Sequence, residues 1–287
     1  MRIGIGLPNP VPGVPGTRLL AWAKHAEERG LASLATIDRL GYPSHDSLTT
    51  LAAAAGATSR IELHTNILLA PLYPAVQLAK AAASLDQLSG GRFSLGLAVG
   101  GREDDYALAG VDFARRGRIL DEQLALLHQA WRGEPVAGSA HPVGPVPVRD
   151  RRVPVMVGGT SDAAIRRVTT YGAGWTMGGG TPDLAAGMAP KVVAAWQEAG
   201  RAGEPRLAAL AYFSLGDDAE EESRSYLRDY YAFLGPYADQ VADRALRSKD
   251  AIRGALRAFE DAGITELTFA PTTTSLEQVD RLADLVL

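Results

Sequence analysis

The sequence predicts a single (β/α)8 barrel spanning residues 1–287, and three observations support this fold class. Short apolar runs with strand periodicity alternate with longer amphipathic segments along the whole chain. The length of 287 residues and the hydrophobic fraction of 46% suffice for one large core. No G-x-G-x-x-G pattern follows the first strand, which weakens the competing open dinucleotide-binding sheet.

The first half of the chain contains four strand–helix units with clear boundaries. The first strand stops at Pro8, because proline cannot donate to a sheet ladder. The first helix ends at Gly30, and Pro74 begins the third, where its missing N–H would be unpaired anyway. Two glycines at 90–91 turn the chain into an alternating fourth strand. The expected elements are strands at 3–7, 33–37, 61–68 and 93–97, and helices at 17–29, 47–57, 74–88 and 115–131.

The second half begins after an irregular segment. Residues 133–152 are rich in proline and glycine and predict a surface excursion, because the strand–helix alternation resumes directly after them. Residues 217–237 are charged and contain several tyrosines; we expect one helix there, and we expect 217–249 to cover the barrel mouth. The expected elements are strands at 155–157, 175–177, 207–215 and 267–270, and helices at 161–171, 183–199, 217–237, 248–261 and from 275 onward.

Composition excludes several functions. The formal charge is −4 and the basic residues form no run, so we expect no nucleic-acid partner. No apolar segment is long enough to span a membrane, and the first strand leaves no room for a signal peptide, which predicts a cytoplasmic protein without a membrane partner. The chain has no cysteine, and its five histidines lack metal-ligand spacing, so no metal site is expected.

Two glycine-rich strand ends predict a phosphate site. Gly158 and Gly159 stand between a strand and the start of a helix, where free N–H groups attract anions. The segment 174–180 repeats this pattern at the next strand end. A glycine pair before a helix also makes an ordinary tight turn, so the prediction depends on the two strand ends together.

Polar residues follow or interrupt three other strands. Asp38 and Arg39 come after the second strand, where they form either a solvated ion pair or part of a catalytic face. On the third strand, Asn66 is a candidate ligand and His64 a candidate acid or base, although a Glu62–His64 hydrogen bond inside the core is the simpler explanation of that pair. A glycine-rich, charged loop at 100–105 is expected to stand around the same pocket.

The sequence lacks the usual protein-based catalysts. No Ser-His-Asp arrangement, no G-x-S-x-G turn and no carboxylate pair on separate strand ends is present. A phosphate site in an apolar barrel therefore favours a bound organic cofactor that brings its own reactivity.

The chain resembles the bacterial luciferase-like, flavin-dependent oxidoreductase family over nearly its whole length. This family includes FMN-dependent monooxygenases and coenzyme F420-dependent enzymes. The segments that carry the resemblance are Ala-Glu-Glu-Arg-Gly-Leu at 26–31, Leu-Asp-Gln-Leu-Ser-Gly-Gly-Arg at 85–92, the glycine-rich run at 96–106, Pro-Val-Met-Val-Gly-Gly-Thr-Ser at 154–161 and Gly-Ala-Gly-Trp at 172–175.

The resemblance implies a luciferase-like barrel with reduced FMN or F420 in its mouth, a small-molecule substrate, O2 in some members, and a homodimer. It implies a non-proline cis peptide at Asn66-Ile67. Many relatives have Asp-His after the second strand, whereas here Arg39 follows Asp38, and a guanidinium cannot shuttle protons near neutral pH. The candidate catalytic residues are Asp38, Arg39 and His64. The candidate cofactor contacts are Thr65, Asn66, Ile67, Gly100, Gly101, Val157, Gly158, Gly159, Thr160, Gly174, Trp175 and Met177.

The primary hypothesis is therefore an oxidoreductase that transfers a hydride or activates O2 on an unidentified small organic substrate. One alternative is a non-catalytic barrel that binds flavin or F420, which agrees with the missing histidine. The other is a barrel hydrolase or isomerase that binds a sugar phosphate directly.

Overall fold

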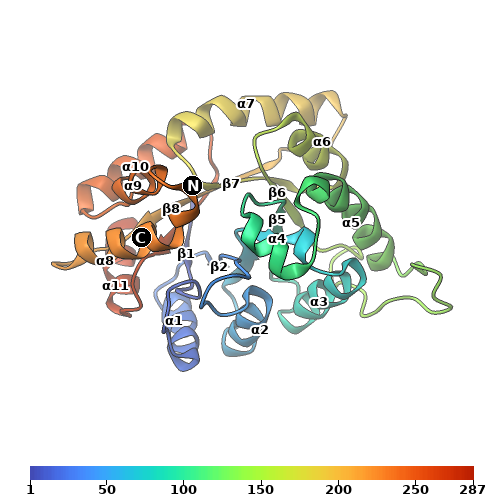
Figure 1. The fold of residues 1–287 in the computed structure, drawn as a ribbon, viewed down its shortest axis with the longest axis horizontal. Coiled ribbons are helices and arrows are strands. Elements are labelled where there is room, and N and C mark those ends of the chain that lie inside the picture. The colour runs from blue at the N-terminus through green and yellow to red at the C-terminus, as the bar shows by residue number, and fades with distance from the viewer.

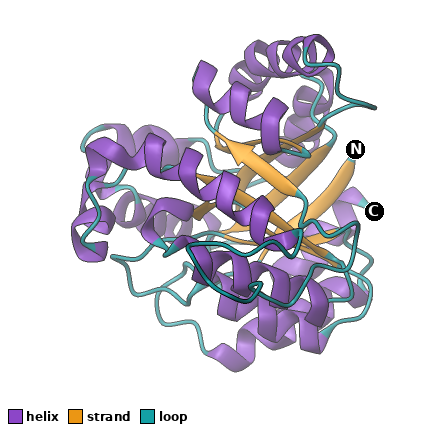
Figure 2. Cartoon of the chain, turned by 90° about the vertical axis from the view of Figure 1, so that its right-hand side faces the viewer, coloured by secondary structure: helices purple, strands orange, loops and turns teal.

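The computed structural model describes residues 1–287 and confirms the predicted barrel (Figure 1). All strand pairs are parallel, and the sheet runs β3-β2-β1-β9-β8-β7-β6-β5-β4. The sheet closes because β3 and β4 both pair with β5, so these two short strands share one of eight positions around the barrel. The strands form the inner layer and the helices the outer layer (Figure 2).

Helices α1, α2, α3, α5, α6 and α7 follow one another around the outside of the strands (Figure 1). The strands are β1 Arg2–Gly6, β2 Ser33–Thr36, β3 Glu62–Thr65, β4 Leu68–Leu69, β5 Phe93–Ala98, β6 Val155–Gly158, β7 Gly174–Gly179, β8 Arg206–Phe213 and β9 Glu266–Pro271. The helices are α1 Gly16–Glu28, α2 Ser47–Ala57, α3 Ala75–Leu88, α4 Glu103–Ala109, α5 Arg116–Trp131, α6 Asp162–Tyr171, α7 Pro182–Glu198, α8 Ala219–Tyr230, α9 Tyr237–Asp243, α10 Lys249–Asp261 and α11 Glu277–Val286, with short 3-10 turns at Ala70–Leu72, Phe113–Arg115 and Ala232–Leu234.

The main core lies between the barrel and the helices. Alternate strand residues point outward into this layer, as the period of two requires, and Ile5, Leu34 and Leu95 are fully buried there. Trp22 and Trp131 fill the same layer from the helix side. The remaining strand positions face the barrel interior, so the interior is the place where polar side chains meet.

The amino-terminal end of the barrel interior is closed by a polar network. Arg206 donates two hydrogen bonds to the Glu266 carboxylate, at 2.6 and 2.7 Å, and a third to the Ser94 hydroxyl at 3.0 Å. His64 pairs with the Thr268 hydroxyl at 3.2 Å. The Glu62–His64 hydrogen bond is therefore not formed; Glu62 pairs with Arg2 instead, at 2.8 Å.

Several boundaries differ from the expectations. The third strand is interrupted at Asn66-Ile67, so β3 and β4 replace one run. The charged part of the expected loop 100–105 begins helix α4, because acidic side chains in a first turn stabilise a helix. Residues 217–237 are not one helix: α8 ends at Tyr230, and Gly235, at a positive φ of 56°, precedes α9.

The irregular segment 133–152 contains no helix or strand and projects beyond α5 (Figure 1). No helix combines the length and hydrophobicity that crossing a bilayer requires.

Candidate active site

Asn66 and Ile67 face the barrel mouth from the third strand position. The peptide between them is cis, which confirms what the resemblance implies. The Asn66 side chain is 3% exposed, and its Oδ1 accepts a hydrogen bond of 2.9 Å from the Thr176 hydroxyl across the barrel. Its Nδ2 is buried without a partner. Buried polar groups are nearly always paired, so this amide marks a position where a polar ligand fits.

Gly158 connects this amide with the glycine-rich start of α6. A Cβ on Gly158 would stand 3.1 Å from Ala98 Cβ and 3.4 Å from Ile67 Cδ1. The next three residues, Gly159 to Ser161, are exposed at the helix start. Ser161 caps the helix by accepting from the Ala164 N–H at 3.3 Å, and the first N–H groups of a helix have no partner within it. The carboxylate of Asp162 repels an anion at this position. Anion binding therefore depends on the backbone N–H groups.

Trp175 supports this helix start from behind. Its indole N–H donates to the Gly159 carbonyl at 2.8 Å, and its ring is fully buried in the layer between barrel and helices. Met177 and Val157 are buried in the same layer and do not face the mouth. Gly174 lies at the amino end of β7, where a Cβ would meet the Arg206 carbonyl at 2.1 Å. These residues shape the barrel wall, and the structure does not bring Gly174 to the candidate site.

Two more of the predicted contacts are structural, and a third is exposed. Thr65 is buried and donates to the Gly96 carbonyl at 2.6 Å. Gly100 has a positive φ of 70° and lies against Leu69, whereas Gly101 is exposed, with nothing within 4 Å of an added Cβ. Gly101 is thus the glycine of this pair that leaves room for a ligand.

Asp38 holds the segment that follows Ile67. Its two carboxylate oxygens accept hydrogen bonds from the Leu69 N–H at 3.0 Å and the Tyr73 hydroxyl at 2.9 Å. Burial raises the pKa of Asp38 to about 6, and the two hydrogen bonds oppose that rise. Both oxygens are occupied, so the geometry gives Asp38 a positioning role.

Arg39 connects the loop after β2 with two helices around the mouth. Its guanidinium donates to the Tyr230 carbonyl at 2.9 Å and to Asp104 at 3.2 Å, and it lies 4.6 Å from the centre of the Tyr42 ring. The cation therefore ties the loop after β2 to α4 and to the end of α8.

The sequence analysis missed a tyrosine cluster and Arg102. The tyrosine cluster consists of Tyr42, Tyr212, Tyr226, Tyr230 and Tyr231. Arg102 lies 4.6 Å from the Tyr230 ring and 5.4 Å from the Tyr231 ring, and the Tyr212 and Tyr231 hydroxyls are 2.8 Å apart. The spacing of Tyr226 and Tyr230 is the signal that could have found the cluster, because residues i and i+4 share a helix face.

Unpaired buried polar atoms gather around this cluster. Besides Asn66 Nδ2, the Nε atoms of Arg39 and Arg102 and the hydroxyls of Tyr226 and Tyr230 are buried without a hydrogen-bond partner. Burial raises the pKa of Tyr230, so its hydroxyl keeps its proton at neutral pH and remains a donor.

His64 lies deeper than the mouth. It pairs in register with Ala35 and Ser94, at the level of the polar network that closes the barrel. Burial lowers its pKa to about 4, and the charges of Arg206 and Arg2 lower it further against the opposing effect of Glu266. The imidazole is therefore neutral at physiological pH and poorly suited to give up a proton.

This pKa predicts how stability depends on pH. Between about pH 6.5 and pH 4 the unfolded chain binds a proton at His64 that the folded chain does not, so this contribution to stability is lost as the pH falls. Between pH 7 and pH 5 the loss is on the order of 2 kcal/mol. His64→Gln should lose that much less than the unchanged protein in urea unfolding at the two pH values. His141→Gln, in an exposed loop, is the control; equal pH dependence in all three proteins would contradict the prediction.

The fold and this rim define a class: an α/β-barrel enzyme whose mouth offers backbone donors, a buried amide and aromatic walls to an organic cofactor. The comparisons with known proteins agree with that class. The sequence model of the luciferase-like monooxygenase family matches residues 1–284. The chain belongs to the luciferase-like monooxygenase family.

Individual relatives share less than a third of their residues with this chain. An uncharacterized protein of Mycobacterium tuberculosis is 28% identical over 256 residues, which cover 79% of this chain and 88% of the relative. The coenzyme F420-dependent tetrahydromethanopterin reductase of Methanopyrus kandleri has a TM-score of 0.79 at 18% identity, covering 99% of this chain and 98% of that one. The oxygenating constituent of the 3,6-diketocamphane monooxygenase of Pseudomonas putida, in complex with FMN, has a TM-score of 0.75 at 15% identity, covering 100% and 98%. At these identities the two structures show the shared fold.

Proposed function

We propose that this protein binds reduced FMN or coenzyme F420 at the barrel mouth and reduces or oxygenates a small organic substrate. One observation carries the proposal. A buried, unpaired amide at Asn66 and an exposed helix start at Gly159 to Ser161 lie on either side of Ile67, whose side chain contacts the Gly158 position. A flat ring with a phosphate-bearing tail makes both kinds of contact. A simple sugar phosphate has no apolar ring that could pack on the surface between them.

The residues present fit such a cofactor. The first N–H groups of α6, with Thr160 and Ser161, would hold the phosphate, and Asn66 Nδ2 would donate to a polar edge of the ring. When bound, the reduced ring supplies a hydride, or in the case of FMN also reacts with O2. The tyrosine cluster and Arg102 would cover the site and exclude water.

Proton transfer is assigned to the tyrosine hydroxyls in this proposal. Arg39 is permanently charged, Asp38 has both oxygens occupied, and His64 is buried away from the rim. Tyr226 and Tyr230 retain unpaired hydroxyls beside the mouth. These hydroxyls would orient a carbonyl or hydroxyl group of the substrate.

Anaerobic titration tests the proposal. Purified protein is titrated separately with reduced FMN, reduced F420 and glucose 6-phosphate, and binding is followed by coenzyme fluorescence or calorimetry. We expect one of the coenzymes to bind at micromolar concentration and, in the presence of the protein, to reduce one of a panel of carbonyl compounds or, with O2, to give an oxygenated product. Binding of glucose 6-phosphate alone would support the sugar-phosphate alternative. Coenzyme binding without formation of a reduced or oxygenated product would support the non-catalytic alternative.

The hydrogen bond behind the helix start gives a matched prediction. Trp175→Phe removes the indole donor to the Gly159 carbonyl, and Trp196→Phe removes an equivalent 2.9 Å bond to the Gly203 carbonyl, far from the mouth. Each should lower the free energy of unfolding by about 1–3 kcal/mol. Only Trp175→Phe should also weaken coenzyme binding, by about tenfold, which is about 1.4 kcal/mol. Equal coenzyme affinities in the two variants would contradict a role of this bond in the site.

The homodimer, the use of O2 and the cytoplasmic location also belong to this proposal, on the strength of the family resemblance. Sedimentation of the purified protein distinguishes a monomer from a dimer directly.

A further inference from the structure

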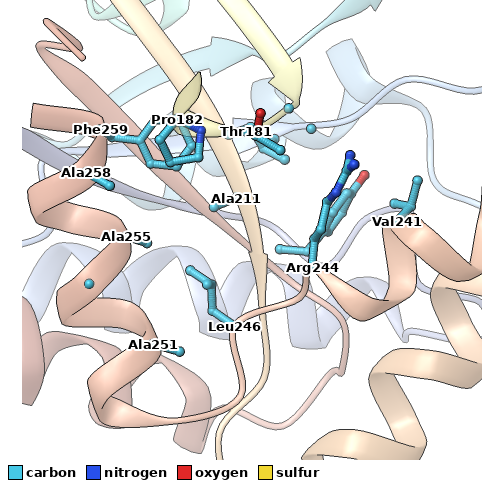
Figure 3. Close-up of a pocket in the computed structure, with 15 residues that line it drawn as sticks. Thr181, Pro182, Ala211, Val241, Arg244, Leu246, Ala251, Ala255, Ala258 and Phe259 are labelled. Carbon is cyan, nitrogen blue, oxygen red and sulfur yellow. The ribbon is translucent and has the colours of Figure 1, made fainter. Parts of the chain in front are cut away.

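A separate cavity lies in the helical layer outside the barrel wall, between β8 and α10 (Figure 3). Its volume is about 360 Å³. Helix α10 forms one side and Arg244 the other, with Ala211 and Leu246 between them (Figure 3). Neither Asn66 nor the start of α6 lines this cavity. It approaches the candidate active site through Tyr212, which lines the cavity and belongs to the tyrosine cluster, and through Gly179, which lies beside Tyr231.

The cavity exists because α10 presents small side chains to the sheet at this level. They are Ala251, Gly254, Ala255 and Ala258. A Cβ built on Gly254 would have no atom within 4 Å, and its φ is not in the left-handed region. Neither the backbone nor a neighbouring side chain therefore requires glycine at this position. A packed interior rarely leaves apolar space of this size, which is in the range of small-molecule sites.

Arg244 stands at the edge of this apolar space without an acidic partner. It is exposed, and its guanidinium makes no ion pair or hydrogen bond within the protein. The neighbouring arginines of the same segment are all engaged: Arg224 with Glu220, Arg228 with Asp239 and Arg247 with the Ser223 hydroxyl. The adjacent Asp243 pairs with Arg224. The positive charge of Arg244 is thus free to meet a ligand anion.

We propose that this cavity binds a small apolar carboxylic acid, with the hydrocarbon chain in the cavity and the carboxylate on Arg244. The apolar lining excludes a ligand with many polar groups, because each would lose its hydrogen bonds to water there. The single cation at the edge selects an anion over a neutral molecule of the same shape. Binding at this cavity is measured without the proposed coenzyme, so its test does not depend on the proposed function.

Calorimetric titration with sodium decanoate tests the proposal on the full-length protein, with decanol as the uncharged comparator. We expect decanoate to bind the unchanged protein and decanol to bind more weakly. Arg244→Gln should weaken decanoate binding by about fivefold, as expected for an exposed ion pair. Gly254→Phe should abolish it by filling the cavity. Arg253→Gln, on the opposite face of α10, should leave it unchanged.

The cavity-filling variant has open space for its first atom and is expected to fold, which a thermal melt checks. Absence of decanoate binding to the unchanged protein would overturn the proposal. So would Gly254→Phe binding decanoate as the unchanged protein does, because the ligand would then lie elsewhere. Equal affinity for decanol and decanoate, or no effect of Arg244→Gln, would refute the assigned carboxylate contact.

Discussion

Replacing Gly158 with aspartate is expected to weaken coenzyme binding by about a hundredfold or more, since juxtaposed like charges cost several kcal/mol. The new Cβ would stand 3.1 Å from Ala98, closer than side chains normally pack, and in ordinary contact with Ile67 at 3.4 Å. The carboxylate beyond it would be directed into the mouth, between the apolar ring surface and the phosphate donors of α6. Fluorescence titration with the coenzyme that binds the unchanged protein measures the loss.

A second variant keeps this prediction testable if the first fails to fold. Thr160 is exposed at the start of α6, so Thr160→Asp brings the same charge to the helix start without filling a buried position. It should weaken coenzyme binding by about tenfold through repulsion of the phosphate. Gly187→Asp is the control, because Gly187 is exposed on α7 and an added Cβ meets nothing within 4 Å. If Thr160→Asp bound the coenzyme as tightly as Gly187→Asp, the phosphate site would be misplaced.

The second large effect concerns the closed end of the barrel. Glu266→Gln should lower the free energy of unfolding by about 3 kcal/mol, because it leaves the Arg206 guanidinium largely buried without its counter-charge. The Glu266 side chain is 15% exposed and that of Arg206 28%, which places the effect at the lower end for a buried pair. Burial raises the pKa of Glu266, but the hydrogen bonds and charge of Arg206 outweigh this and hold it below its ordinary value. Urea denaturation at neutral pH measures the change.

An exposed ion pair provides the comparison. Arg118 and Glu122 form a 2.8 Å pair on α5 with side chains 73% and 57% exposed. Glu122→Gln should cost less than about 1 kcal/mol, as exposed pairs usually do. Replacing both Arg206 and Glu266 with apolar residues should recover much of the loss, because no unpaired charge then remains. A similar cost for Glu266→Gln and Glu122→Gln would show that burial does not strengthen the barrel pair.

The barrel itself could be predicted because its signals are local. Pro8, Gly30 and Pro74 stop or start elements through their own backbone chemistry. The errors in the fold concern the boundaries of two elements. Residues 103–105 begin α4 instead of a loop, because acidic side chains in a first turn stabilise a helix. Residues 217–237 form two helices that are separated at Gly235.

The candidate site was predicted in part. Asn66 and Gly158 meet at the mouth through Ile67, as expected of residues at the carboxyl ends of parallel strands. Trp175 was expected to face the cofactor but lies behind the wall, where it supports Gly159. A strand residue faces inward or outward according to its register with both neighbours, and one residue of shift reverses the face.

The alternation of strands and helices, and with it the closed parallel barrel, was determined by the sequence alone. The helical and strand periods that separate apolar from polar faces can be recognised from residues close together in the chain. The tertiary structure alone decided which side chains surround the mouth. Arg39 meets the Tyr230 carbonyl 191 residues away, and Asn66 meets Thr176 110 residues away. Such contacts depend on how the barrel closes and where each loop crosses its rim, and no local pattern carries that information.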